Sequence, residues 1–89
     1  MLGWFVYVLQ GPSTRFTYIG STNNLQRRLA EHSKGLVQST KAYRPLRVVA
    51  YVAVPTERQA RNLEHYFKTG SGKAILRKRI LTDEAVSQA

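Results

Sequence analysis

The stretch FTYIGSTNNLQRRLAEH, which begins at Phe16, holds several of the side chains in this sequence that could do chemistry. Tyr18 stands near the end of a β-type run, and Arg27, Arg28 and His32 follow in a segment with helical spacing. An arginine stays protonated at physiological pH and can hold a phosphate through two hydrogen bonds. A histidine can donate or accept a proton near neutral pH. These residue types allow chemistry on an anionic substrate, provided that they point to one place.

Helical geometry separates the two arginines. Consecutive residues of a helix are ~100° apart, and Leu25 and Leu29 mark its buried direction. Arg28 then points about 60° from Leu25 and His32 about 20° from it, whereas Arg27 points to solvent or to a nucleic acid backbone. Arg28 and His32 are therefore the inward candidates. Two ordinary explanations stay open, because Arg28 can snorkel over a sheet and His32 can be a packing residue.

Elimination leaves a single carboxylate as a candidate ligand. The other four are expected on the solvent side of a helix, in a first helical turn or in a terminal segment: Glu31, Glu57, Asp83 and Glu84. Glu64 is central and flanks an inward face, roughly 100° from Leu63. Its ordinary alternative is an i,i+4 ion pair with Lys68. One carboxylate does not suit a two-metal site, but a single Mg²⁺ keeps much of its water shell and needs few protein ligands.

Two β-type runs must position the tyrosines. Residues 4–9 and 16–20 are aromatic and β-branched, and the link between them contains glycine and proline, which predicts an antiparallel hairpin. If the hairpin is symmetric about its turn, Tyr7 lies opposite Tyr18. The two side chains then share one face of the sheet, with Cβ atoms roughly 5 Å apart.

A helix and a third strand follow the hairpin. The polar residues 21–24 supply N-cap candidates for a helix that runs to about Ser33, and Gly35 is a suitable stop. Residues 46–54 form an almost continuous apolar run, as expected of a central strand covered on both faces. The chain therefore alternates between extended and helical elements.

The remaining elements complete one small domain. Thr56 and Gln59 form a capping box that opens a second helix, and a further short helix is expected around residues 75–80. The order β-β-α-β-α predicts an α/β fold, a small sandwich in which helices flank a three-stranded, largely antiparallel sheet. We expect the domain to occupy residues 1–82, with residues 83–89 as a tail.

The charge of the chain favours a polyanionic partner. The 89 residues contain 14 lysines and arginines against five acids, a net charge of +9, and nucleic acid is the obvious partner for such a balance. The sequence has no cysteine, which excludes disulfides and thiolate metal sites. We find no apolar run of the ~20 residues that span a bilayer, and no signal-peptide pattern at the N-terminus. We therefore expect a cytoplasmic protein.

The sequence resembles the GIY-YIG nuclease superfamily. The segments FVY at 5–7 and YIG at 18–20 resemble its paired motif, although Phe5 stands where the family has glycine. The resemblance continues through the arginine at 28 and the glutamate at 64. The layout is most similar to the small, stand-alone, single-domain branch of that superfamily, over roughly residues 3 to 80.

This resemblance implies a metal-dependent endonuclease that cuts phosphodiester bonds in DNA, as the incision domains of DNA repair nucleases do. Glu64 would be the ligand of Mg²⁺ or Mn²⁺, Arg28 would stabilise charge on the scissile phosphate, and a nearby arginine and metal would favour the phenolate of a tyrosine. The implied catalytic residues are Tyr7, Tyr18, Arg28 and His32. The implied substrate-binding residues are Gly20, Ser21, Arg27, Lys41 and Tyr43.

Two other classes of function stay open at the level of sequence. The domain could be a nucleic-acid-binding module that keeps the scaffold and cleaves little, or an accessory subunit that docks through its basic face. Branched, damaged or single-stranded DNA is the expected substrate, with RNA a weaker alternative. The sequence does not indicate an oligomeric state.

Overall fold

A three-stranded antiparallel sheet forms the centre of the computed structural model, which describes residues 1–13 and 16–81. The first strand, β1 (Trp4–Gln10), lies between β2 (Thr17–Thr22) and β3 (Arg47–Val54) and pairs antiparallel with both. The predicted α/β class and the antiparallel sheet are confirmed. The tail expected at residues 83–89 lies outside the described residues.

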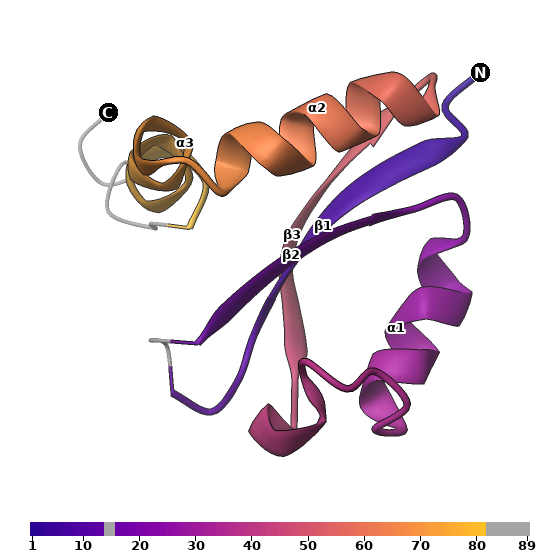
Figure 1. Cartoon of the computed structure of the whole chain (residues 1–89), viewed down its shortest axis with the longest axis vertical. Coiled ribbons are helices and arrows are strands. Elements are labelled where there is room, and N and C mark those ends of the chain that lie inside the picture. Colours follow the sequence, from indigo (N-terminus) through magenta and orange to yellow (C-terminus); the bar gives the residue numbers. More distant parts are fainter. Residues whose placement is uncertain (14–15, 82–89) are drawn as a thin grey trace, which may run out of the picture.

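Helices cover the sheet on both sides. Helix α1 lies on one side of it, and α2 and α3 lie on the other (Figure 1). In chain order the helical elements are α1 (Leu25–Ser33), the 3₁₀ turn η1 (Lys41–Tyr43), α2 (Glu57–Phe67), α3 (Gly70–Ile75) and the π-helical segment η2 (Leu76–Ile80). Within residues 1–13 and 16–81, no helix has the length and apolar character needed to cross a bilayer.

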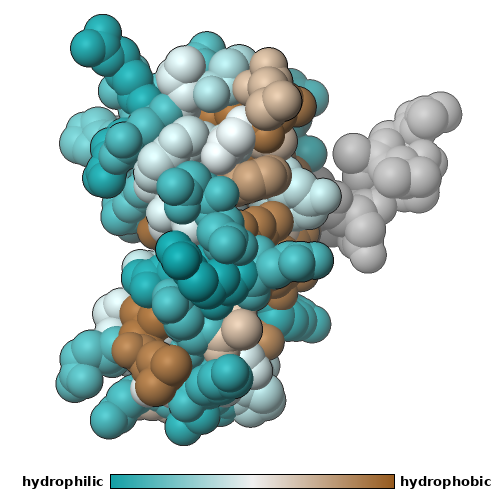
Figure 2. All heavy atoms as spheres, turned by 90° about the vertical axis from the view of Figure 1, so that its right-hand side faces the viewer, coloured by the Kyte–Doolittle hydropathy of each residue, from teal (hydrophilic) through white to brown (hydrophobic). Residues whose placement is uncertain are grey.

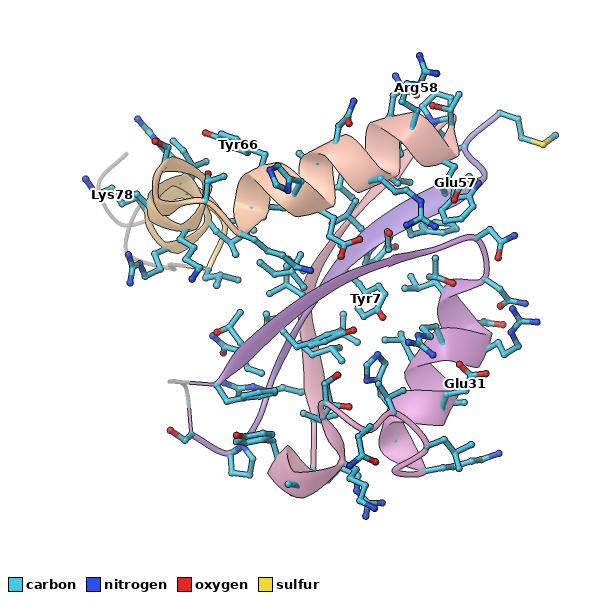
Figure 3. All side chains as sticks on the ribbon, in the orientation of Figure 1. Tyr7, Glu31, Glu57, Arg58, Tyr66 and Lys78 are labelled. Atoms are coloured by element: carbon cyan, nitrogen blue, oxygen red, sulfur yellow. The ribbon has the colours of Figure 1, made fainter. Side chains whose placement is uncertain are left out.

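The apolar core lies between the sheet and α2. Because successive residues of a strand point to opposite faces, Val6 and Val8 of β1 face α2. The core consists of these two valines together with Ile19, Ala60, Phe67 and Leu76. Burying one such large side chain contributes about 1.5–3 kcal/mol. The same alternation turns Tyr7 toward α1 (Figure 3), so the face opposite the core is free to carry polar chemistry.

Two predicted elements differ from the observed ones. We expected the apolar run at 46–54 to be a central strand, but β3 is an edge strand in which Val48 and Tyr51 are 41% and 58% exposed. β1 occupies the centre, with every residue of Val6–Leu9 buried. An apolar run predicts a strand but does not fix the place of that strand in the sheet. Here the bulky side chains of β1 occupy the central position, where a strand is paired on both sides and covered by helices.

The helix ends follow the sequence closely, with one exception. The Asn24 side chain caps α1 by accepting from the Arg27 backbone N–H at 3.1 Å, and Gly35 follows the helix with φ +79°, a conformation that favours glycine. The capping box of α2 is present as predicted. The third helix begins at Gly70, earlier than expected, because Thr69 caps it through the Gly72 N–H.

Candidate active site

The β1–β2 hairpin sets the position of the two tyrosines. Tyr7 pairs with Gly20, and Tyr18 pairs with Leu9, so the symmetric register that we predicted is wrong by two residues. The turn is centred further along the chain, and β2 continues to Thr22. A shift of two residues preserves the face to which each side chain points. The tyrosines therefore still share a face, as diagonal neighbours with ring centroids 6.2 Å apart.

Gly20 makes room for the Tyr7 side chain. A Cβ at position 20 would lie 2.5 Å from the Tyr7 hydroxyl oxygen and 2.7 Å from Cζ, distances that real Cβ atoms do not show. The resemblance implied that Gly20 lets the backbone approach closely at the end of the strand and takes part in substrate binding. The group that approaches it in the structure is the phenol ring of Tyr7.

A chain of hydrogen bonds runs from Tyr7 into the interior. The Tyr7 hydroxyl lies 2.9 Å from His32 Nε2, and His32 Nδ1 lies 2.8 Å from Thr40 Oγ1. The three residues are 1%, 1% and 0% exposed. Thr40 Oγ1 also lies 3.5 Å from the Val37 carbonyl. If the Thr40 hydroxyl donates there, its oxygen accepts from His32 Nδ1–H, and Nε2 is left to accept the Tyr7 proton.

The protonation states agree with this direction. Burial, followed by the nearby positive charge of Arg28, lowers the pKa of His32 below 6.5, so its ring is neutral at neutral pH. Burial raises the pKa of Tyr7 to about 12, although Arg28 opposes that rise. Of the two groups expected to favour a phenolate, the arginine alone is outweighed by burial. In the tautomer described above, the neutral Tyr7 hydroxyl donates to His32 Nε2 at neutral pH.

Arg28 lies at the edge of this cluster. Its Nη1 is 3.0 Å from Glu31 Oε1, and both side chains are about one third exposed. The Glu31 carboxylate and then the Tyr7 hydroxyl raise the pKa of Arg28 further. The orientations predicted for the two arginines are confirmed, since Arg27 is exposed. Glu31 differs from its prediction, because it is half-buried and pairs with Arg28.

Glu64 lies across β2 from the tyrosines. Its Oε1 accepts from the Ser21 hydroxyl at 2.5 Å, and its Oε2 accepts from Lys68 Nζ at 2.8 Å. Burial raises the pKa of this carboxyl, but the hydrogen bonds from Lys68 and Ser21 outweigh burial, and the net shift is downward. Glu64 is thus ionised at neutral pH. Its charge raises the pKa of Tyr7, which links the two sides of β2 electrostatically.

The donor set of Glu64 fits one hydrated divalent ion. Among residues 1–13 and 16–81, no three histidine, aspartate or glutamate side chains gather as a metal cluster. Mg²⁺ does not need such a cluster, because waters and a substrate phosphate complete its shell. The Lys68 side chain is 53% exposed and can leave Oε2, while Ser21 keeps the carboxylate oriented. An ionised, oriented carboxylate on α2, beside the edge strand β2, suits this ion.

The side chains of two predicted substrate-binding residues take no part in the hydrogen-bond chain. Lys41 and Tyr43 are both exposed in η1, and the Tyr43 ring stacks against Phe16. The sequence did not single out Thr40. It stands in a loop without periodicity, and the one available signal was that a buried histidine needs a second polar partner.

The model of the GIY-YIG catalytic domain matches residues 3–79. This match covers most of the chain, which therefore belongs to the GIY-YIG family, a nuclease-type family. The chain is also similar to a protein of Bacillus pumilus (strain SAFR-032) named UPF0213 protein, with 39% identity over 57 residues. That match covers 63% of this chain and 58% of the relative, a little over half of its length. No solved structure matches the chain significantly.

Proposed function

We propose that this protein is a divalent-metal-dependent endonuclease that hydrolyses phosphodiester bonds in DNA that is branched, damaged or single-stranded. The observation that carries the proposal is the buried chain Tyr7–His32–Thr40, whose Tyr7 end lies beside Arg28. Glu64 of α2 lies on the other side of β2, where it accepts from Ser21. The net charge of +9 supports a nucleic acid substrate. The side of the molecule that carries α1 is mostly hydrophilic, with hydrophobic side chains in separate upper and lower groups (Figure 2).

Arg28 holds the scissile phosphate in this mechanism. Its guanidinium keeps its charge at neutral pH and matches two phosphate oxygens with parallel hydrogen bonds. The side chain of its present partner, Glu31, is 35% exposed, so a phosphate can replace the carboxylate at a small cost in free energy. The negative charge that develops on the phosphate oxygens in the transition state is then stabilised by a cation already in place.

Tyr7 and His32 activate the attacking water together. As the water attacks phosphorus, it gives a proton to the Tyr7 oxygen while the Tyr7 proton moves to His32 Nε2. A free phenolate, which a pKa of about 12 disfavours, never has to form. The imidazolium that results keeps donating from Nδ1 to Thr40. Tyr18 stands edge-on against the His32 ring, at 5.1 Å between centroids, and holds it in place.

Glu64, oriented by Ser21, would hold the Mg²⁺ or Mn²⁺ ion. When bound, this ion supplies Lewis acidity to the leaving 3′ oxygen. A proton from bulk water then completes the new hydroxyl group.

Cleavage assays test the proposal with matched variants. Purified protein is incubated with labelled forked, nicked, linear and single-stranded DNA and Mg²⁺ or Mn²⁺. Arg28→Ala is compared with Arg58→Ala, at an exposed position of α2, and Glu64→Gln with Glu57→Gln. We expect cleavage to be abolished in the first member of each pair and retained in the second. Equal activity within either pair would contradict the assigned roles.

The second candidate function is a DNA-binding module that does not cleave. One observation favours it: the Lys68 ammonium already neutralises the Glu64 carboxylate, as in an ordinary helical i,i+4 pair. Binding to all four DNA substrates without cleavage of any, under both metals, would establish this alternative.

A further inference from the structure

An aromatic stack joins the start of β2 to η1. The Phe16 and Tyr43 rings are almost parallel, with an interplanar angle of 5° and centroids 3.8 Å apart. Phe16 covers one face of the Tyr43 ring. The Tyr43 residue is nevertheless 48% exposed, so part of its surface stays open to solvent beside the stack.

The stack lies next to the candidate active site along the chain and along the strand. Phe16 lies directly before the first residue of β2 and two residues before Tyr18, a separation of about 7 Å between Cα atoms in extended chain. Tyr43 ends η1, and η1 begins directly after Thr40, the partner of His32. Both connections lead from the stack to the Tyr7–His32 pair.

The surroundings of the stack are basic and partly apolar. Lys41, Arg44 and Arg47 are exposed, and the two arginines donate to neutral oxygens, of Ser33 and Lys41 for Arg44 and of Gln10 for Arg47. Their charges are therefore not compensated by these contacts. The first acid in the chain, Glu31, is paired with Arg28, and the next one is Glu57.

A shallow pocket of about 220 Å³ adjoins this region. It is lined by Gly11, Pro12, Pro45, Leu46 and Arg47. Gly11 packs against the backbone of Tyr43, where an added Cβ would lie 2.8 Å from the carbonyl oxygen. The pocket and the stack thus belong to one surface, which combines a partly exposed aromatic ring, apolar walls and unneutralised cations.

The geometry points to a nucleobase-stacking site on Tyr43 that takes an unpaired base of single-stranded DNA. The base lies on the face of the ring opposite Phe16, and Lys41 and Arg44 face the phosphates beside it. Bases inside a duplex are stacked on each other, whereas an unpaired base can stack on an aromatic side chain without regard to its identity. The inference rests on the proposed function in one respect. The direction of the bound strand follows from it, because the unpaired nucleotides lie next to the phosphate held by Arg28.

Binding measurements without divalent metal test this site separately from cleavage. Fluorescence anisotropy follows a labelled short oligothymidylate, in EDTA, with wild-type protein, Tyr43→Ala and Tyr43→Phe, and a duplex of equal length serves as comparison. Tyr66→Ala is the matched control, because Tyr66 is 41% exposed on α2, on the other side of the sheet. We expect Tyr43→Ala to weaken single-strand binding about tenfold or more. Tyr43→Phe, Tyr66→Ala and all duplex affinities should stay near wild type.

Unchanged single-strand binding by Tyr43→Ala, or an equal loss for single strand and duplex, would overturn the site. An abasic scan with wild-type protein keeps the test independent of how the variant folds. One abasic position should weaken binding more than the others, and a uniform effect would overturn the inference. Specific binding without any cleavage would remove the proposed nuclease function and leave this site standing. Cleavage together with single-strand binding that does not depend on Tyr43 would remove the stacking site and leave the proposed nuclease function standing.

Discussion

The Tyr7 hydroxyl and His32 Nε2 are 2.9 Å apart, and both side chains are almost completely buried. The buried phenol and the buried imidazole satisfy each other through this hydrogen bond. The pair also spans the space between β1 and α1 and fixes the distance between these elements. The polar contact that the proposed chemistry uses is therefore also a structural contact of the fold.

Thr40→Val should change the hydrogen bond between Tyr7 and His32, although Thr40 contacts only His32 of the two. Valine has nearly the shape of threonine but cannot accept from His32 Nδ1–H, which leaves a buried donor without its partner. We expect a loss of stability of about 1–3 kcal/mol and a shift of the His32 proton toward Nε2. Cleavage should fall about tenfold or more, because Nε2–H cannot accept the Tyr7 proton.

Nitrogen NMR of the imidazole ring reads the tautomer directly, and the chain has one other histidine, His65, which simplifies the assignment. Thr40→Ser keeps the hydroxyl and should restore both the Nδ1–H tautomer and cleavage. A Thr40→Val protein with the wild-type tautomer would show that Thr40 does not set the proton position.

Gly20→Ala should displace the Tyr7 ring. The new methyl group would lie 2.5 Å from the hydroxyl oxygen, and the ring cannot move freely because its hydroxyl is buried and bonded to His32. We expect a stability loss of about 1–3 kcal/mol, in the range of overpacked cores, and a large loss of cleavage. Gly3→Ala is the control, since its Cβ would meet nothing within 4 Å. A Gly20→Ala protein with unchanged activity would argue against a role for the Tyr7 position.

The sequence predicted the faces of the site well because faces depend on period alone. The two-residue period of a strand puts Tyr7 and Tyr18 on one face even with the wrong register. The helical period turned Arg28 and His32 inward and Arg27 outward. The period of a helix or strand fixes the direction in which a side chain points, but it does not identify the residue that this side chain contacts. For that reason the ion pair of Arg28 with Glu31 and the bond of Ser21 to Glu64 were not expected.

The order and register of the strands were harder to predict from the sequence than the faces to which side chains point. Hairpin register depends on turn geometry, which the residues around 11–16 do not determine by type. The edge position of β3 depends on which strand pairs on both sides, a property of the whole sheet. Thr40 lies directly before the short turn η1, where no regular spacing of apolar residues indicates which side chains are buried.

High pH should destabilise the protein through Tyr7. Its pKa is about 12 in the folded protein against 10.0 in the unfolded chain, so the native state holds this proton more tightly. The corresponding stability is fully present below pH 10 and is lost as the pH rises toward 12. The difference amounts to about 3 kcal/mol. Chemical denaturation at a series of pH values measures this loss.

Tyr7→Phe should reduce the loss of stability between pH 10 and pH 12, because phenylalanine has no proton to lose in this range. The same substitution removes the hydrogen bond to His32. The matched variant Tyr51→Phe, at an exposed position of β3, should keep the decline. The prediction fails if the alkaline profile of Tyr7→Phe is indistinguishable from wild type.

Ser21→Ala should weaken metal binding without changing the fold. The Ser21 hydroxyl donates to Glu64 Oε1, and groups that orient a metal ligand in this way typically contribute 10- to 100-fold in affinity or activity. We expect Mn²⁺ to bind about tenfold more weakly, measured by electron paramagnetic resonance of the free ion, and cleavage to need more Mg²⁺. Thr17→Ala is the control, because Thr17 lies on the same face of β2 and is exposed. Wild-type Mn²⁺ affinity in Ser21→Ala would mean that Lys68 alone orients the Glu64 carboxylate.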